Sequence, residues 1–138
     1  MEFDNILHPG MAREETFIVA SEHLAAHVGS GSARVLATPW MIAFMERTAR
    51  DLLAEALPEG YSSVGVHVNV RHLAPSPAGS RVRARVDVVE VEGAKVDFTV
   101  NAWDEQELIG EGTHQRMVID EARFLRRVER KLASQTGE

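Results

Sequence analysis

The chain contains no cysteine, which excludes disulfide bonds, cysteine zinc sites and thiolate nucleophiles together. It also lacks an apolar run near the ~20 residues that a membrane span requires. The N-terminal segment is acidic and has no apolar core of the signal-peptide kind, so we expect a cytoplasmic protein without a membrane partner. The formal charge of -6 argues against nucleic acid as a partner. It does not argue against a small anionic ligand, because a few placed arginines are enough to bind one.

The 138 residues are expected to form one domain, residues 1–138, with the apolar and charged fractions usual for a globular protein. The hydrophobic pattern predicts strands at 15–20, 63–73, 81–91, 95–104 and 108–119, and a long helix at 38–57. A short helix or lid-like turn is expected at 21–28, followed by a flexible loop at 29–33. The short turns between the last four strands require antiparallel neighbours. These elements predict an α+β fold in which an antiparallel sheet of about five strands wraps around one long central helix.

A last amphipathic helix is expected at 121–132, with a frayed tail after it. Its apolar stripe consists of Phe124, Leu125, Val128 and Leu132. The tail extends from residue 133 to the end of the chain.

The strand at 63–73 alternates cleanly and ends in an unexpected residue. Its even positions from 64 to 70 are all valine, which predicts one buried face, and the next residue on that face is His72. A histidine there is either a satisfied side chain at a strand end or part of a site. Gly65 within the strand indicates either a bulge or a close backbone approach, at which its N–H can hold a carbonyl oxygen.

The long helix carries two further candidates. Thr38 before Pro39 is typical of a helix cap followed by proline at the first helical position. At about 100° per residue, Glu46 lies on the margin of the apolar stripe, where it either pairs with Arg50 or points into a cavity. The apolar sector itself contains Ile42, Met45, Ala49, Leu52, Leu53 and Ala56.

Other side chains support simpler interpretations. His23 and His27 have a metal-compatible spacing, but no third ligand accompanies them, so we expect no metal. Arg116 is either a solvated strand residue or a guanidinium free to bind phosphate or carboxylate. A solvated outer sheet face is expected for Arg81, Arg83 and Arg85.

The segments VLATPWMIAFMERTA, SSVGVHVNVRHLAPSPAG and IGEGTHQRMVID resemble the hotdog-fold thioesterases, and specifically the fluoroacetyl-CoA thioesterase family. The resemblance extends over about residues 35–119. It implies a hotdog fold and an acyl-CoA thioesterase that needs no cofactor. It also implies that Thr38, Glu46 and His72 are catalytic and that Gly65 and Arg116 bind substrate. The chain departs from the family at position 39, where proline replaces a glycine and removes a backbone donor that could serve the oxyanion. The residues that confer preference for a fluorinated acyl group are not carried over by the resemblance, so fluoroacetyl specificity is not predicted.

A thioester needs a nucleophile or an activated water, a proton source for the thiolate and donors for the oxyanion. Glu46 either activates water or attacks directly, His72 relays the proton, and Thr38 orients the water or the carboxylate. Thr38 and Glu46 lie about 12 Å apart along one helix, which predicts a homodimer whose site is shared between protomers. The alternatives are a non-catalytic hotdog module that binds acyl-CoA as a sensor or carrier, and a hotdog hydratase, whose aspartate–histidine motif is not found.

Overall fold

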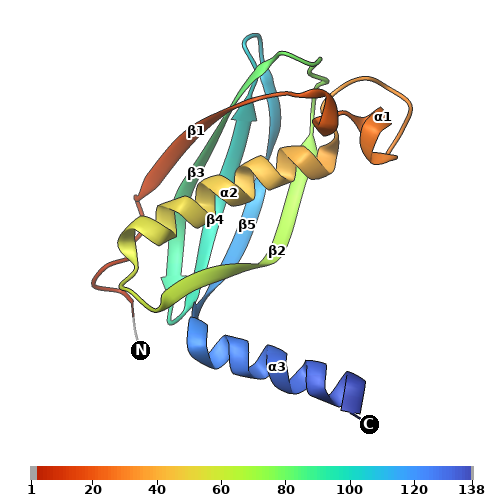
Figure 1. Ribbon diagram of the computed structural model, residues 1–138. Coiled ribbons are helices and arrows are strands. Elements are labelled where there is room, and N and C mark those ends of the chain that lie inside the picture. Colours follow the sequence, from red (N-terminus) through yellow and green to blue (C-terminus); the bar gives the residue numbers. More distant parts are fainter. Residues whose placement is uncertain (1–2, 138) are drawn as a thin grey trace.

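The computed structural model describes residues 3–137, and in it a curved antiparallel sheet holds one long helix against its inner face (Figure 1). This confirms the predicted α+β hotdog architecture. The strand order is β1-β3-β4-β5-β2, so β1 and β2 form the two edges of the sheet. No helix among the described residues is long and apolar enough to cross a membrane. The strands are β1 (Ala12–Ile18), β2 (Tyr61–His72), β3 (Arg81–Glu92), β4 (Lys95–Trp103) and β5 (Leu108–Asp120).

The central helix α2 (Thr38–Ala56) is held by apolar packing against the middle strands. Four residues of the predicted stripe are buried, whereas Ile42 and Ala56 are only half-buried. Phe44 adds to the buried face by stacking on Phe17 of β1 with ring centroids 4.4 Å apart, and Met41 and Thr48 are buried as well. The inward-facing residues of β3 and β4 are almost all small or branched and fully buried. They are Val82, Ala84, Val86, Val88, Val96, Phe98, Val100 and Ala102.

A bulge changes the facing of the edge strand β2. The register with β5 shifts between Gly65 and His67, which leaves Val66 as the extra residue. The prediction of one buried valine face was therefore wrong in two respects. First, Val64 pairs with Met117, so its side chain does not point to the inner face of the sheet. Second, Val66 and Val68 are 49% and 37% exposed, because no further strand covers this edge of the sheet.

The segment before α2 folds over the N-terminal end of that helix. It contains the short 3-10 turn η1 (Ser21–His23) and the short helix α1 (Ala25–Val28), followed by the glycine-rich loop at 29–33. Isolated bridges from Leu24 to Leu36 and from Val35 to Pro77 attach it to the rest of the fold. The ring of His23 packs against Trp40, with ring centroids 4.4 Å apart. This segment therefore forms a lid at one end of the molecule.

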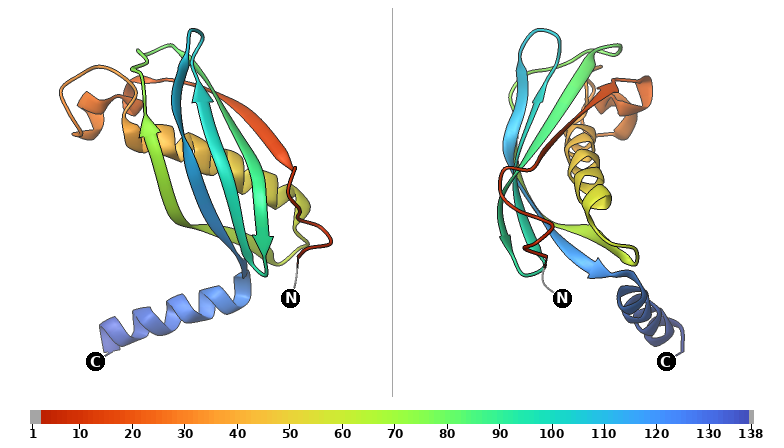
Figure 2. Two further views of the ribbon diagram at one scale, coloured as in Figure 1. Left: turned by 180° about the vertical axis from the view of Figure 1, so that it is seen from behind. Right: turned by 90° about the vertical axis from the view of Figure 1, so that its left-hand side faces the viewer.

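The last helix α3 (Glu121–Gly137) differs most from the expectation. It remains helical through Gly137, whereas a frayed tail after Leu132 was predicted; Glu138 of that tail lies outside the described residues. Figures 1 and 2 show that α3 leaves the end of β5 and projects away from the sheet. Its predicted apolar stripe is consequently exposed, with Phe124 at 39% and Leu125 at 56%.

Candidate active site

Thr38 and His72 form a hydrogen-bonded pair at the N-terminal end of α2. The Thr38 hydroxyl lies 2.7 Å from Nδ1 of His72, which is the last residue of β2. Thr38 was also predicted as the helix cap, but the capping position belongs to Ala37 and makes no side-chain cap bond. The threonine hydroxyl is thus directed to the imidazole instead of to the helix backbone.

The other ring nitrogen of His72 is available for chemistry. Its Nε2 is buried and makes no hydrogen bond with the described residues. Burial keeps the pKa of His72 below its ordinary value, and the nearby backbone of Ala74 only partly opposes that shift. His72 therefore remains neutral at pH 7 and can offer Nε2 as a donor or an acceptor, depending on which tautomer Thr38 selects.

A cavity of about 340 Å³ opens beside this pair, between the lid and the turn that follows β2. Its volume lies at the small end of the range for ligand pockets. Seven of the ten lining residues have apolar side chains, and Thr38 and His72 are two of the three polar ones. The other lining residues are Ala25, Ser30, Val35, Leu36, Ala37, Leu73, Ala74 and Pro75.

Glu46 lies two turns further along α2, against Gly65 of the bulge. A Cβ atom built on Gly65 would lie only 2.7 Å from Oε2 of Glu46, so a side chain at this position would collide with the carboxylate. Glu46 makes no ion pair with Arg50, which instead pairs with Asp51 at 2.8 Å. Glu46 was predicted either to pair with Arg50 or to point inward. The structure shows no pair with Arg50, and the half-buried carboxylate lies between the helix and the sheet.

Arg116 lies on the inner face of β5 and is buried, which excludes the reading of a solvated or unattached guanidinium. Its Nε and Nη2 donate to the hydroxyl and the carbonyl of Ser63, at 2.8 and 3.1 Å. Its Nη1 lies 3.2 Å from Nε2 of His114. Burial lowers the pKa of Arg116, while the Glu46 carboxylate acts in the opposite direction. The guanidinium is thus a fixed cation facing the carboxylate.

His114 is the residue that the sequence did not single out. Its Nδ1 lies 2.9 Å from the His67 carbonyl, and a carbonyl only accepts, so the proton is on Nδ1 and Nε2 accepts from Arg116. Burial lowers the pKa of His114, which favours this neutral form. The available signal was its spacing of two residues from Arg116, which sets both side chains on the same face of a strand.

The five predicted site residues therefore form two groups in one chain. Thr38 and His72 meet at one end of α2, and Glu46, Gly65 and Arg116 meet near its middle. On β2 the two groups are seven residues apart, about 23 Å for an extended strand. Within a single chain, no contact among the described residues brings Thr38 and Glu46 to one reaction centre.

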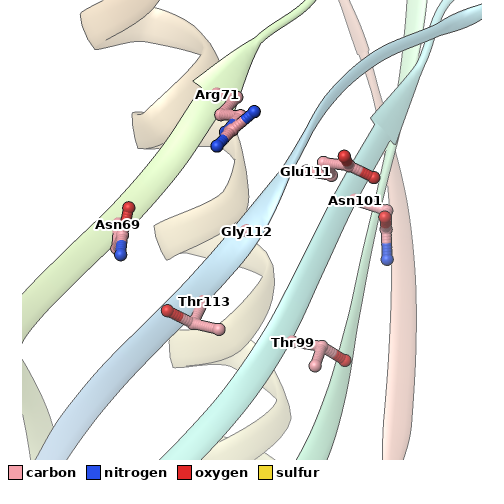
Figure 3. Close-up of a pocket in the computed structure, with 7 residues that line it drawn as sticks. All are labelled: Asn69, Arg71, Thr99, Asn101, Glu111, Gly112 and Thr113. Carbon is pink, nitrogen blue, oxygen red and sulfur yellow. The ribbon is translucent and has the colours of Figure 1, made fainter.

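A larger hollow of about 580 Å³ lies on the opposite face of the sheet (Figure 3). Its lining is polar and comes from β2, β4 and β5. The sheet separates it from α2 and hence from both groups of site residues, so it is not part of this site. Its lining residues are Asn69, Arg71, Thr99, Asn101, Glu111, Gly112 and Thr113.

Comparisons with known proteins agree with the fold and the predicted class. The structure matches a hot-dog-like protein from Thermanaerovibrio acidaminovorans at 27% identity, with a TM-score of 0.87 over 95% of this chain and 97% of that one. It matches a thioesterase superfamily member from Thermus thermophilus at 28% identity and a TM-score of 0.88, with the same coverage. The chain is therefore a thioester hydrolase of the hotdog class.

The particular family follows from the sequence comparisons. Residues 19–122 match the family model described as fluoroacetyl-CoA-specific thioesterase, so the chain belongs to that family. The fluoroacetyl-CoA thioesterase of Streptantibioticus cattleyicolor is 35% identical over 97 residues, which is 70% of each protein. A solved fluoroacetyl-CoA thioesterase superposes with a TM-score of 0.85 at 29% identity, over 91% of this chain and 97% of that one.

Proposed function

We propose that this protein hydrolyses the thioester of a small acyl-CoA, and that Thr38, Glu46 and His72 perform the reaction. The observation that carries the proposal is the Thr38–His72 hydrogen bond, made where a capping bond was expected and beside a cavity large enough for a short acyl group. Because CoA thioesters are intracellular metabolites, the proposal also assigns the reaction to the cytoplasm.

In this proposal the Glu46 carboxylate either removes a proton from the attacking water or itself attacks the thioester carbonyl. The C–S bond then breaks, and His72 takes up the proton removed from water and passes it to the departing thiolate, which leaves the imidazole neutral again. If Glu46 attacks directly, water hydrolyses the resulting anhydride and supplies that proton. The Thr38 hydroxyl holds the imidazole through Nδ1 and fixes its tautomer. The products are the free acid and CoA with its thiol restored.

Arg116 and Gly65 are proposed to hold the substrate carbonyl. A guanidinium has five N–H donors, and three of those of Arg116 are engaged by Ser63 and His114. Two donors therefore remain for an oxygen that gains negative charge. A rigid, desolvated donor is worth more to an oxyanion than a mobile one in water, which supports this assignment.

The proposed active unit is a homodimer formed through β2. This edge strand has unpaired backbone groups and the exposed side chains of Val66 and Val68, a combination that favours pairing with another strand. The other edge, β1, is short and carries charged residues such as Arg13 and Glu14, which protect an edge.

An antiparallel β2–β2 pair also explains the two separate groups of site residues. If the two-fold axis lies near Asn69, His72 of one protomer falls opposite the Gly65–Val66 bulge of the second. The Thr38–His72 pair of one chain then faces Glu46 of the other, which gives two equivalent composite sites.

Release of free thiol from acyl-CoA tests the reaction, and the absence of cysteine makes a thiol reagent specific for CoA. Glu46→Gln should lower kcat by several orders of magnitude while leaving the fold intact. If acyl-CoA binds saturably but no thiol is released across a broad panel of acyl groups, the protein is a non-catalytic binding module and the enzyme proposal is wrong.

Subunit mixing tests the composite site. Inactive Thr38→Ala and Glu46→Gln chains, once exchanged, should regain activity because the heterodimer contains one intact site. If exchange is confirmed and no activity returns, both residues serve the same chain's site.

A further inference from the structure

The helix α3 is an amphipathic arm whose large apolar side chains are exposed in the described structure. It leaves the sheet at Asp120, and four large apolar side chains along it are between 39% and 58% exposed. A helix of 17 residues is only marginally stable in water without packing of its apolar face. The exposed stripe consists of Phe124, Leu125, Val128 and Leu132.

The direction of α3 indicates where its covering surface lies. Figure 1 shows that α3 passes below the molecule and extends beyond the free edge strand β2, on the side of the sheet that carries α2. The views in Figure 2 agree with this placement. A second copy paired through β2, as proposed above, would occupy the space toward which α3 points.

The charge of α3 is opposite to that of the rest of the chain. The helix contains five arginine or lysine residues and two glutamates, within a chain of formal charge -6. At about 100° per residue, Arg127 and Lys131 flank one side of the apolar stripe. The rest of the chain is thus more acidic than the whole, and it is electrostatically complementary to α3.

Antiparallel pairing through β2 selects the part of the second copy that α3 meets. In such a pair the α3 end of one chain would lie beside the opposite end of its partner, and Figure 1 shows that the turn between β4 and β5 is at that opposite end. That turn carries two exposed carboxylates, Glu105 and Glu107, while Asp104 is occupied in accepting the amides of Gln106 and Glu107.

We propose that α3 docks its apolar stripe on the second copy of this chain, with Arg127 and Lys131 facing the acidic β4–β5 turn of that copy. The proposal rests on the β2 dimer proposed above, but not on catalysis. It adds a second contact to that dimer, outside the sheet. In the second copy, the β4–β5 turn, the turn after β2 and the lid all lie at one end of the molecule. The docked α3 would therefore also lie close to the lid of the second copy.

The absence of cysteine allows a direct test by crosslinking. A photoactivated maleimide crosslinker is attached to the full chain at Val128→Cys, within the stripe, or at the control Arg126→Cys on the opposite face of α3. We expect a covalent dimer from position 128 and much less from position 126. A dimeric protein in which position 128 links only within its own chain, or equally with position 126, overturns the docking. Sedimentation of a monomer overturns the dimer as well.

Charge reversal provides the second test. Arg127→Glu with Lys131→Glu should raise the dimer Kd by about 10-fold or more, and adding Glu105→Arg with Glu107→Arg should restore it. Failure of the second pair to restore dimerisation overturns the assigned contact. Both readouts are independent of thiol release, so loss of the proposed enzyme activity and loss of this docking are separately visible.

Anionic vesicles test the alternative that the apolar stripe of α3 binds a lipid surface instead of a second copy of the chain. The full chain is sedimented with phosphatidylglycerol vesicles beside Leu125→Asp/Val128→Asp. We expect neither protein to bind, because the stripe is covered in the dimer. Binding of the unaltered chain alone would assign the stripe to a lipid surface and overturn the proposal.

Discussion

The substitution Gly65→Ala tests whether the Glu46 carboxylate belongs to the reaction. The added methyl group would lie 2.7 Å from Oε2 of Glu46, 3.2 Å from Cε1 of His114 and 3.5 Å from Nη1 of Arg116. Ordinary contacts begin at 3.4 Å, so the carboxylate must retreat by about 0.7 Å, whereas the histidine and the arginine hardly need to move. The backbone N–H at position 65 remains and His114 needs to shift by only about 0.2 Å, so the displaced carboxylate is the main expected cause of any loss of activity.

The expected cost falls on catalysis rather than on stability. A misplacement near 1 Å lowers the rate by about 100-fold, so we expect kcat of Gly65→Ala to fall by roughly that factor. The carboxylate is the far end of a flexible, half-buried side chain, and Gly65 has no positive φ, so the fold accepts the methyl group. Replacing glycine by alanine also removes freedom from the unfolded chain, which offsets about 0.4–1 kcal/mol of any strain.

Gly112→Ala is the matched control. Its methyl group would lie 2.1 Å from the Asn69 carbonyl oxygen and 2.6 Å from Cα of Val70, so β2 and β5 would have to separate. We expect this variant to lose several kcal/mol of stability, in contrast to Gly65→Ala. Thermal unfolding and thiol release are measured on both. A Gly65→Ala protein that keeps kcat within about threefold of the unaltered enzyme refutes the role of Glu46.

Three further outcomes follow from the site. Thr38→Val should lower kcat by about 100-fold and Thr38→Ser by much less, in thiol-release assays, because only the hydroxyl holds Nδ1 of His72. His114→Leu removes the acceptor for Nη1 of Arg116, so kcat should fall about 10-fold or more while His114→Gln retains part of the activity. The pKa values of His72 and His114 are lowered in the folded state, so the unfolded state binds more protons below about pH 6.5. The free energy of unfolding, measured with denaturant, should therefore be constant above that pH and decrease as pH falls through the folded pKa values, and His114→Gln should flatten the decrease.

The sequence was sufficient for the elements whose faces are decided by regular periodicity. The short turns of the meander follow from local pattern and are confirmed, and four of the six residues predicted for the apolar stripe of α2 are buried. The positions of Thr38 and Glu46 on the helix were equally readable. Their partners were not, because the hydrogen bond of Thr38 depends on a strand that ends 34 residues later.

The features that sequence analysis missed depend on what an element contacts. The stripe of α3 gives the same pattern whether the helix packs on its own sheet or projects from it, so periodicity alone could not predict that the stripe is exposed. The hydrogen bond from Arg116 to Ser63 joins residues 53 positions apart in the sequence, so no local sequence pattern predicts it. His114 was visible only as one letter of a motif.

The bulge in β2, which the sequence pattern did not reveal, determines how Gly65, Glu46 and Arg116 are arranged in the candidate active site. The valines at even positions continue through residue 66 without interruption, so the alternation conceals the extra residue. Regular pairing would set Val66 opposite Arg116, and its branched side chain would occupy the place where even a methyl group meets the Glu46 carboxylate at 2.7 Å. With Val66 left unpaired, Gly65 is opposite Arg116 instead, and Ser63 reaches the same inner face to hold the guanidinium. The bulge therefore makes room for the carboxylate, and it exposes Val66 on the edge through which the dimer is proposed to form.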